Sequence, residues 1–167
     1  DIKNKRWTEK SHMPFSGSVI GATANGELYV LSKLHETYRD CRSYMASYRP
    51  KTNAWSMKRS LPEARCNATA VGIGRRLYVV GGYNWPNRES GGHAPFHPNL
   101  FVYDTIRDSW SSDPQWCANI ANPVVAAVGS RLHLIERPHE VYDVETGSRA
   151  LRTINPYGRR AASAVAV

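Results

Sequence analysis

Cysteine is scarce in this sequence, and the few cysteines present are not arranged as metal ligands or redox pairs. Only three occur among 167 residues, Cys41, Cys66 and Cys117, and no two of them form a CxxC motif. An odd and widely spaced set argues against the disulfide framework of a small secreted domain. We therefore expect a protein of a reducing compartment, the cytoplasm.

Long apolar runs are also missing. No stretch approaches the roughly 20 apolar residues that a membrane-spanning helix needs, so we expect no membrane partner. The first residues, Asp1 to Trp7, contain neither an initiator methionine nor the apolar core of a signal peptide. We expect the chain to be part of a longer polypeptide.

Acidic residues are outnumbered by basic ones. There are 14 Asp and Glu against 22 Lys and Arg, which gives a net charge of +8. A basic excess favours acidic partners and speeds the encounter with them. Because the basic residues occur in scattered pairs, without a polybasic block, a reading helix or an aromatic-basic motif, nucleic-acid binding is not favoured.

No catalytic or metal-binding constellation is present in the sequence. His93 and His97 are the only histidines at ligand-like spacing, and the neighbouring Pro95 and Pro98 argue against a helix that would place them on one face. No sequence resembles a nucleophile elbow. We therefore predict no catalytic residues, no metal and no cofactor.

What the sequence does contain is an internal repeat. Residues 24–31, 73–80 and 128–135 each place a short polar turn containing glycine before an aliphatic run, and these copies are about 50 residues apart. Each copy predicts one β-strand, a tight turn and a second strand.

A second signature follows each copy of the first. Residues 48–55 and 103–110 begin with a tyrosine (Tyr48, Tyr103), continue through a polar turn and end on a tryptophan (Trp55, Trp110). Residues 142–149 repeat the pattern with arginine at the last position. Each unit therefore holds four short strands, which predicts an all-β fold of four-stranded antiparallel sheets packed radially, as in the blades of a propeller.

The complete middle unit resembles the kelch repeat. The resemblance rests on Arg65, on the run from Leu77 to Gly81-Gly82, and on Tyr103 with Trp110. Glycine at the end of the second strand tolerates positive φ and close backbone approach. Ser32-Lys33 and Glu136-Arg137 replace the glycine pair in the outer repeats, so we expect those corners to differ.

The repeat predicts how the chain is divided. We expect the end of a preceding blade at 1–11, a degenerate repeat at 12–59, the complete repeat at 60–115, a second degenerate repeat at 116–156 and the start of a further blade at 157–167. The resemblance thus implies about three kelch-type blades of an incomplete propeller, because propellers have four to eight.

The resemblance to kelch-like proteins of the BTB-kelch family also implies where a protein ligand binds. In such adaptors an arginine at the position of Arg65, and residues just after the glycine pair, grip peptide ligands. The implied binding residues are Arg65, Arg160, Tyr83, Asn84, Trp85 and Arg88, with His35 and Ser16 at equivalent loop positions. The alternative for Arg65 is that it braces neighbouring blades by donating hydrogen bonds to backbone carbonyls.

Three functions follow from the resemblance. The first is a substrate-recognition domain of a BTB-kelch adaptor, which binds a protein or acidic peptide and reaches a cullin-type ubiquitin ligase through domains outside this chain. The second is a scaffold that binds actin. The third, a kelch-fold metalloenzyme, is least favoured because the sequence offers no catalytic set.

Overall fold

The computed structural model describes residues 3–37, 40–83, 99–113, 115–116, 120, 123–135 and 139–152, with the backbone alone for 33–37 and 40–42. These residues form thirteen strands and no helix. Within these ranges no helix long and apolar enough to cross a membrane was found.

The first sheet contains five antiparallel strands. Its main path runs in the order β1-β2-β4-β5, and β3 pairs with β2 beside this path. The strands are β1 (Ser18–Ala24), β2 (Glu27–Thr37), β3 (Asp40–Arg42), β4 (Met45–Arg49) and β5 (Ala54–Lys58). Asn25 and Gly26 join β1 to β2 with φ of 50° and 74°, the left-handed pair that a two-residue hairpin requires.

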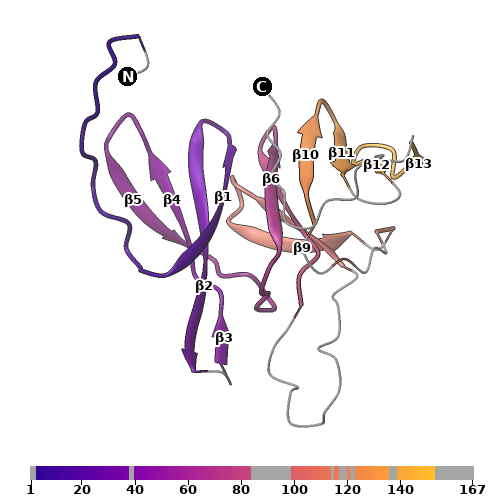
Figure 1. Ribbon diagram of the computed structural model, residues 1–167, viewed down its shortest axis with the longest axis horizontal. Coiled ribbons are helices and arrows are strands. Elements are labelled where there is room, and N and C mark those ends of the chain that lie inside the picture. Colours follow the sequence, from indigo (N-terminus) through magenta and orange to yellow (C-terminus); the bar gives the residue numbers. More distant parts are fainter. Residues whose placement is uncertain are drawn as a thin grey trace.

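The second and third sheets each contain four antiparallel strands in chain order. The second is formed by β6 (Thr69–Ile73), β7 (Arg76–Val80), β8 (Leu100–Asp104) and β9 (Ser109–Asp113). The third is formed by β10 (Val125–Val128), β11 (Arg131–Leu134), β12 (Glu140–Asp143) and β13 (Arg149–Leu151). Figure 1 shows the three sheets following one another across the molecule.

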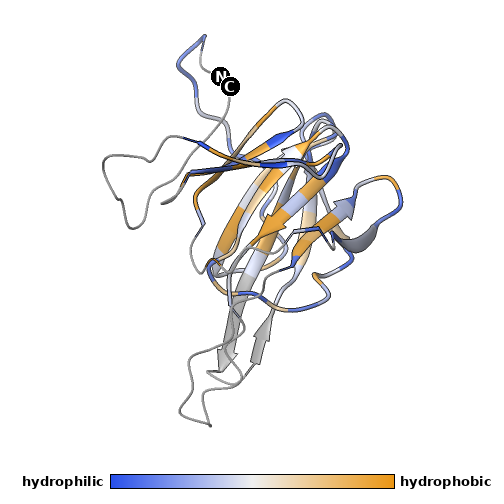
Figure 2. Ribbon diagram, turned by 90° about the vertical axis from the view of Figure 1, so that its right-hand side faces the viewer, coloured by the Kyte–Doolittle hydropathy of each residue, from blue (hydrophilic) through white to orange (hydrophobic). Residues whose placement is uncertain are grey.

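The sheets pack through two separate hydrophobic cores. Between the first and second sheets, Tyr29, Met45 and Leu77 belong to one buried cluster. Between the second and third, Val80 and Leu132 belong to another. Figure 2 shows apolar residues along the strands and hydrophilic residues at many of the turns.

The first strands of the three sheets lie side by side at the crowded end of this packing. β6 contacts both β1 and β10. A Cβ added to Gly72 of β6 would lie 1.9 Å from the carbonyl oxygen of Thr23, so the two strands touch backbone to backbone. The predicted all-β fold of propeller blades is confirmed, with four strands along the main path of each sheet.

The corner after the second strand differs between the first two blades. We expected His35 to lie in a loop, which is wrong: β2 continues to Thr37, and His35 pairs with Cys41 of β3. At Ser32 the backbone N–H donates to the Tyr44 carbonyl at 2.8 Å, and the Ser32 hydroxyl accepts from the Tyr44 N–H at 3.2 Å. In the second blade Gly81, at φ 64°, ends the strand instead.

Candidate protein-binding site

The turn between β8 and β9 of the second blade binds Arg59, the residue that follows the last strand of the first blade. Asp108, at φ 48°, accepts hydrogen bonds on Oδ1 from the Tyr103 hydroxyl at 2.5 Å and from the Arg59 N–H at 3.0 Å. The Trp110 indole N–H donates to the Arg59 carbonyl at 2.8 Å. Burial, together with the hydrogen bond to Asp108, raises the pKa of Tyr103 strongly. We call this set of contacts the Tyr–Asx–Trp latch.

The first blade repeats the latch one unit earlier. Asn53, at φ 52°, accepts from the Tyr48 hydroxyl at 2.8 Å and from the Ser11 N–H at 3.0 Å. The Trp55 indole donates to the Ser11 carbonyl at 2.9 Å, and the Trp55 and Tyr48 ring centroids are 5.1 Å apart. The structure thus places the four repeat aromatics in contacts between consecutive units.

The third blade lacks two latch residues, and substitutes come from the last residue of β9 and from the linker that follows it. Gly147 stands where the other blades have Asn53 and Asp108. The Tyr142 hydroxyl donates instead to Asp113 Oδ2 at 2.5 Å. The ring of Trp116 packs edge-on against Tyr142 with centroids 5.1 Å apart and is 2% exposed. The sequence repeat did not reveal Trp116, because it lies in the linker and not at the repeat position.

Gly81 and Gly82 form a corner that no larger residue fits. Their φ angles are 64° and 86°. A Cβ on Gly81 would lie 2.5 Å from the Ile120 carbonyl oxygen, and one on Gly82 would lie 2.7 Å from the Cys66 carbonyl oxygen. The Gly82 N–H donates to the Ile120 carbonyl at 2.9 Å. This corner therefore ties the second blade to the chain entering the third.

Arg65 lies beneath this corner. Its Nη1 donates to the carbonyls of Gly81 at 3.2 Å and Asn99 at 2.8 Å, and the guanidinium lies 4.3 Å from the Phe101 ring centroid. The side chain is 2% exposed, and burial lowers its pKa to about 10. Gly81, Asn99 and Phe101 all belong to the same blade as Arg65, so these contacts brace that blade itself; bracing of neighbouring blades and a ligand contact both stay predictions.

The Nε and Nη2 atoms of Arg65 are buried and have no hydrogen-bond partner within the part of the chain that the structure describes. Nε and Nη2 form one edge of the guanidinium fork, the edge that matches the two oxygens of a carboxylate. A buried cation with unsatisfied donors is costly, and an anion bound at this edge would offset that cost.

Tyr83 lies directly after the glycine corner and is half-buried. It pairs with Cys66 through reciprocal backbone hydrogen bonds of 2.9 and 3.0 Å. Asn67, at φ 57°, donates through Nδ2 to the Tyr83 hydroxyl at 3.2 Å. Sequence reasoning missed Asn67, although a residue type that tolerates left-handed φ was the available signal.

The other predicted binding residues are not brought into this group by the described structure. Ser16 is exposed on the segment before β1. His35 lies on the extension of β2, where only the backbone is described. Asn84, Trp85, Arg88 and Arg160 lie outside the described residues, as do His93 and His97.

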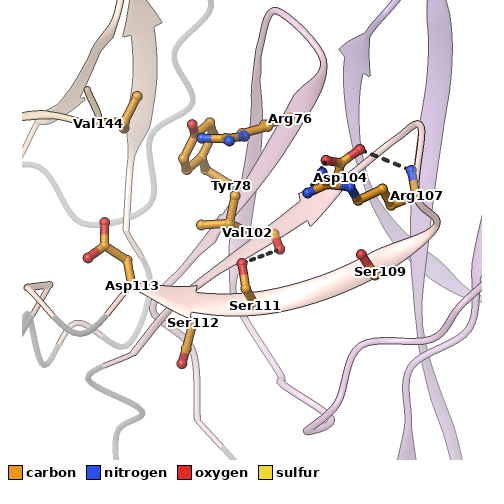
Figure 3. Close-up of a pocket in the computed structure, with 10 residues that line it drawn as sticks. All are labelled: Arg76, Tyr78, Val102, Asp104, Arg107, Ser109, Ser111, Ser112, Asp113 and Val144. Atoms are coloured by element: carbon orange, nitrogen blue, oxygen red, sulfur yellow. Dashed lines mark hydrogen bonds and ion pairs between the residues drawn. The ribbon is translucent and has the colours of Figure 1, made fainter.

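A polar cleft of about 350 Å³ opens between the second and third blades. Its base contains Tyr78 and Val102, and Val144 approaches from the third blade (Figure 3). The remaining lining residues are hydroxylic or charged: Arg76, Asp104, Arg107, Ser109, Ser111, Ser112 and Asp113. The lining includes no histidine or cysteine that could act as a base or nucleophile beside the serines.

The two carboxylates of the cleft already have partners. Asp104 accepts from the N–H groups of Arg107 and Ile106 at 3.0 and 2.9 Å, which hold the pKa of its carboxyl below the usual range. Asp113 accepts from the Tyr142 hydroxyl and from the Gln115 N–H. The cleft therefore presents hydroxyls and guanidinium groups, with its carboxylates engaged within the protein.

One histidine pair lies on the face of the third blade away from the second. His133 Nδ1 and His139 Nε2 are 3.3 Å apart. Burial, with His139, Arg131 and Arg152 nearby, lowers the pKa of His133. Over the described ranges no group of three or more metal-ligating side chains was found.

The blades, the latch and the glycine corner together define a kelch-type β-propeller. Residues 64–115 match the Kelch motif, and the three sheets have the arrangement of kelch-type propeller blades. It is 34% identical to an F-box/kelch-repeat protein of Arabidopsis thaliana over 65% of this chain and 22% of that protein. It is 31% identical to human Kelch-like protein 30 over 54% of this chain and 14% of that protein.

A solved structure shares the fold. The chain matches the structure of YjhT with a TM-score of 0.68 and 19% identity, over 92% of this chain and 57% of that chain. At this identity the likeness concerns the fold alone. The chain spans about a fifth or less of the length of the two relatives above.

Proposed function

We propose that this chain is part of a substrate-recognition propeller that binds an acidic segment of another protein. The observation that carries the proposal is the Nε–Nη2 edge of Arg65, which is buried and has no hydrogen-bond partner among the described residues, while Nη1 is fixed by two carbonyls. A Glu or Asp side chain of a ligand would pair with this edge in a bidentate way.

Binding at this edge requires a change of shape, because Arg65 is 2% exposed. The residues that cover it must move before a carboxylate can reach the guanidinium. The net charge of +8 would attract an acidic partner over the approach. Tyr83, next to the corner, would supply an aromatic contact on the same side.

The test compares acidic peptides with their amide counterparts on the full-length protein that carries this chain. An array of peptides containing Glu or Asp is probed beside the same array with Gln and Asn. We expect the amide change and Arg65→Lys each to weaken the strongest binders roughly tenfold or more, because a charge-assisted bidentate pair contributes about 1.5–3 kcal/mol. Arg107→Ala, which removes an exposed arginine of the cleft, is the control and should leave binding unchanged.

The proposal fails if the amide peptides bind as well as the acidic ones. That comparison changes only the ligand, so it remains valid even if Arg65→Lys weakens the glycine corner. Melting temperatures of both variants show whether the corner is intact.

We further propose that the parent protein is cytoplasmic and acts as an adaptor of a cullin-type ubiquitin ligase. The names of the relatives support this proposal, since one is an F-box/kelch-repeat protein and another is a Kelch-like protein. Co-precipitation of a cullin with the full-length protein tests the proposal. Co-sedimentation with F-actin without cullin binding would favour a scaffold instead, and a stoichiometric bound metal would favour an enzyme.

A further inference from the structure

The polar cleft between the second and third blades is separate from the glycine corner. Strand β7 begins at Arg76, which lines the cleft, and ends at Val80, directly before Gly81. Arg65 contacts the Gly81 carbonyl, so it lies at the other end of the sheet, roughly 15 Å from Arg76 along the strand. The site proposed above for acidic peptides therefore leaves this cleft unused.

The strand register places the cleft residues in two rows across the second blade. In the first row Arg76 of β7 pairs with Asp104 of β8, and Asp104 pairs with Ser109 of β9. Because alternate residues of a strand face the same side of a sheet, the next row on this face lies two residues further along. That second row contains Tyr78, Val102 and Ser111.

Two guanidinium groups lie at the first row with few partners of their own (Figure 3). Arg76 donates to the Tyr78 hydroxyl and forms no ion pair with a carboxylate among the described residues. Nη1 of Arg107 lies 4.0 Å from Asp104 Oδ2, and the Arg107 side chain is 82% exposed. Such an exposed and long ion pair contributes little to stability, so the Arg107 guanidinium can turn to another acceptor at small cost.

The carboxylate of the first row is held by the turn that follows it. Asp104 Oδ1 accepts the N–H groups of Ile106 and Arg107, and the charges of Arg107 and Arg75 lie close to this carboxyl. Three arginines, at positions 75, 76 and 107, therefore surround one carboxylate. The first row has an excess of positive charge that the described residues leave uncompensated.

The remaining acidic groups near the cleft lie away from the first row. Asp113 is the last residue of β9, roughly 13 Å along the strand from Ser109, and its Oδ2 accepts the Tyr142 hydroxyl. Glu145 belongs to the turn after β12 of the third blade. An anion would therefore be favoured at the Arg76 end of the cleft and disfavoured at the Asp113 end.

We propose that Arg76, Arg107 and Ser109 form a binding site for a phosphate monoester group. The three terminal oxygens of this group point in different directions, and the three side chains come from β7, from the β8–β9 turn and from β9. A planar carboxylate would use donors from one direction only. Arginine binds phosphate through charge-assisted hydrogen bonds. The group belongs either to a phosphorylated serine or threonine of a protein or to a small phosphorylated molecule.

The first test measures binding of N-acetyl-phosphoserine amide to the full-length protein by calorimetry, beside N-acetyl-serine amide. We expect only the phosphorylated compound to bind. Arg76→Gln and Arg107→Gln should each weaken its binding about tenfold, because each removes a charge-assisted contact. Lys51→Gln is the control matched in charge, since Lys51 is exposed in the turn after β4 and does not line the cleft. It should change the affinity by less than about twofold.

Two results would overturn the site. In the first, the serine compound binds as well as the phosphoserine compound, a comparison that needs no substitution. In the second, Arg65→Lys abolishes binding while Arg76→Gln has no more effect than Lys51→Gln, because the phosphate then binds at the glycine corner. Arg76 and Arg107 are exposed, so we expect both variants to keep the melting temperature of the wild type within about 2 °C.

A second measurement distinguishes the two sources of the phosphate group. An array of phosphoserine and phosphothreonine peptides is probed with the full-length protein, beside the same array without phosphate. Peptides that bind about tenfold more tightly than N-acetyl-phosphoserine amide would identify a phosphorylated protein as the partner, and an array without such peptides would identify a small molecule. Both results support the site. Phosphopeptide binding that survives Arg76→Gln together with Arg107→Gln would contradict it.

Discussion

Trp116 performs in the third blade the packing role that Trp55 and Trp110 perform in the first two. The ring reaches Tyr142 from the linker, at almost the same centroid distance as in the other blades. Burial of a large aromatic ring against this tyrosine stabilises the third blade on the second.

Replacing Trp116 by alanine should therefore be costly. We expect Trp116→Ala to lower the free energy of unfolding by about 3–5 kcal/mol, because it removes a buried aromatic ring. Ile106→Ala, at a residue that is 60% exposed, should change it by no more than about 0.5 kcal/mol. Urea denaturation followed by circular dichroism measures both; equal effects would show that the linker ring contributes nothing.

Asp108 makes the latch of the second blade sensitive to acid. Partial burial raises the pKa of its carboxyl, but the hydrogen bonds from the Tyr103 hydroxyl and the Arg59 N–H, with Lys58 and Arg59 nearby, outweigh this and lower the pKa overall. Because the pKa of the carboxyl is lower in the folded state than in the unfolded chain, the ionised Asp108 stabilises the fold at any pH above the unfolded pKa of about 4. This contribution is lost as the pH falls below that value.

Exchanging the two Asx residues tests this prediction. Asp108→Asn should be less stable than the wild type at pH 7, and the difference should shrink between about pH 4 and pH 2. Asn53→Asp, the reverse exchange in the first blade, should add acid sensitivity over the same range. Thermal unfolding across this pH series measures both, and a difference that stays constant with pH would contradict the assignment.

Among the strands, β6 depends most closely on its neighbours. Its Gly72 faces the Thr23 carbonyl of β1, and its Thr69 hydroxyl donates to the Pro123 carbonyl before β10 at 2.6 Å. The strand is thus fixed from both sides by backbone contacts, and these contacts set the spacing of the blades.

A methyl group at Gly72 should disrupt this spacing. We expect Gly72→Ala to cost about 3 kcal/mol or more, because the nearest atom to the new Cβ is a backbone oxygen that cannot rotate away. Gly21→Ala in β1 is the control: its Cβ would meet the nearest atom at 3.6 Å, an ordinary contact, so the change should be neutral or slightly stabilising. Denaturant unfolding distinguishes the two, and equal costs would refute close packing at Gly72.

The elements were predictable from sequence where the repeat residues were kept. Leu28, Leu77 and Leu132 mark the second strand in all three blades, and the turn glycines mark the hairpins. The extension of β2 could not be predicted, because whether a strand continues past Ser32 depends on a partner segment at Tyr44 and not on Ser32 alone. The role of Trp116 escaped for the same reason, since it arises from a contact between units.

In the whole molecule, each blade is stabilised mainly by its neighbours. The two hydrophobic cores both involve the second blade, so its strands are covered on both faces, whereas the first and third blades each contribute to one core. Stability in such a stack is approximately a sum of unit and interface contributions.

This arrangement predicts an order of hydrogen exchange. We expect the amides of β6 and β7 to exchange most slowly and those of β13 fastest among the described strands, because β13 is a short outer strand with exposed residues on either side of Ala150. Exchange mass spectrometry of the folded protein measures this order. Uniform protection across the three sheets would instead indicate a single cooperative unit.

The contacts that replace those missing at Gly147 and Arg149 have a consequence for counting repeats. Asp113, at the end of β9, supplies the acceptor, and Trp116, in the linker, supplies the ring. A blade can therefore form without the residues that mark it in the sequence: residues 64–115 match the Kelch motif, and the described residues form three blades. In such proteins the number of recognisable motifs is a lower bound on the number of blades.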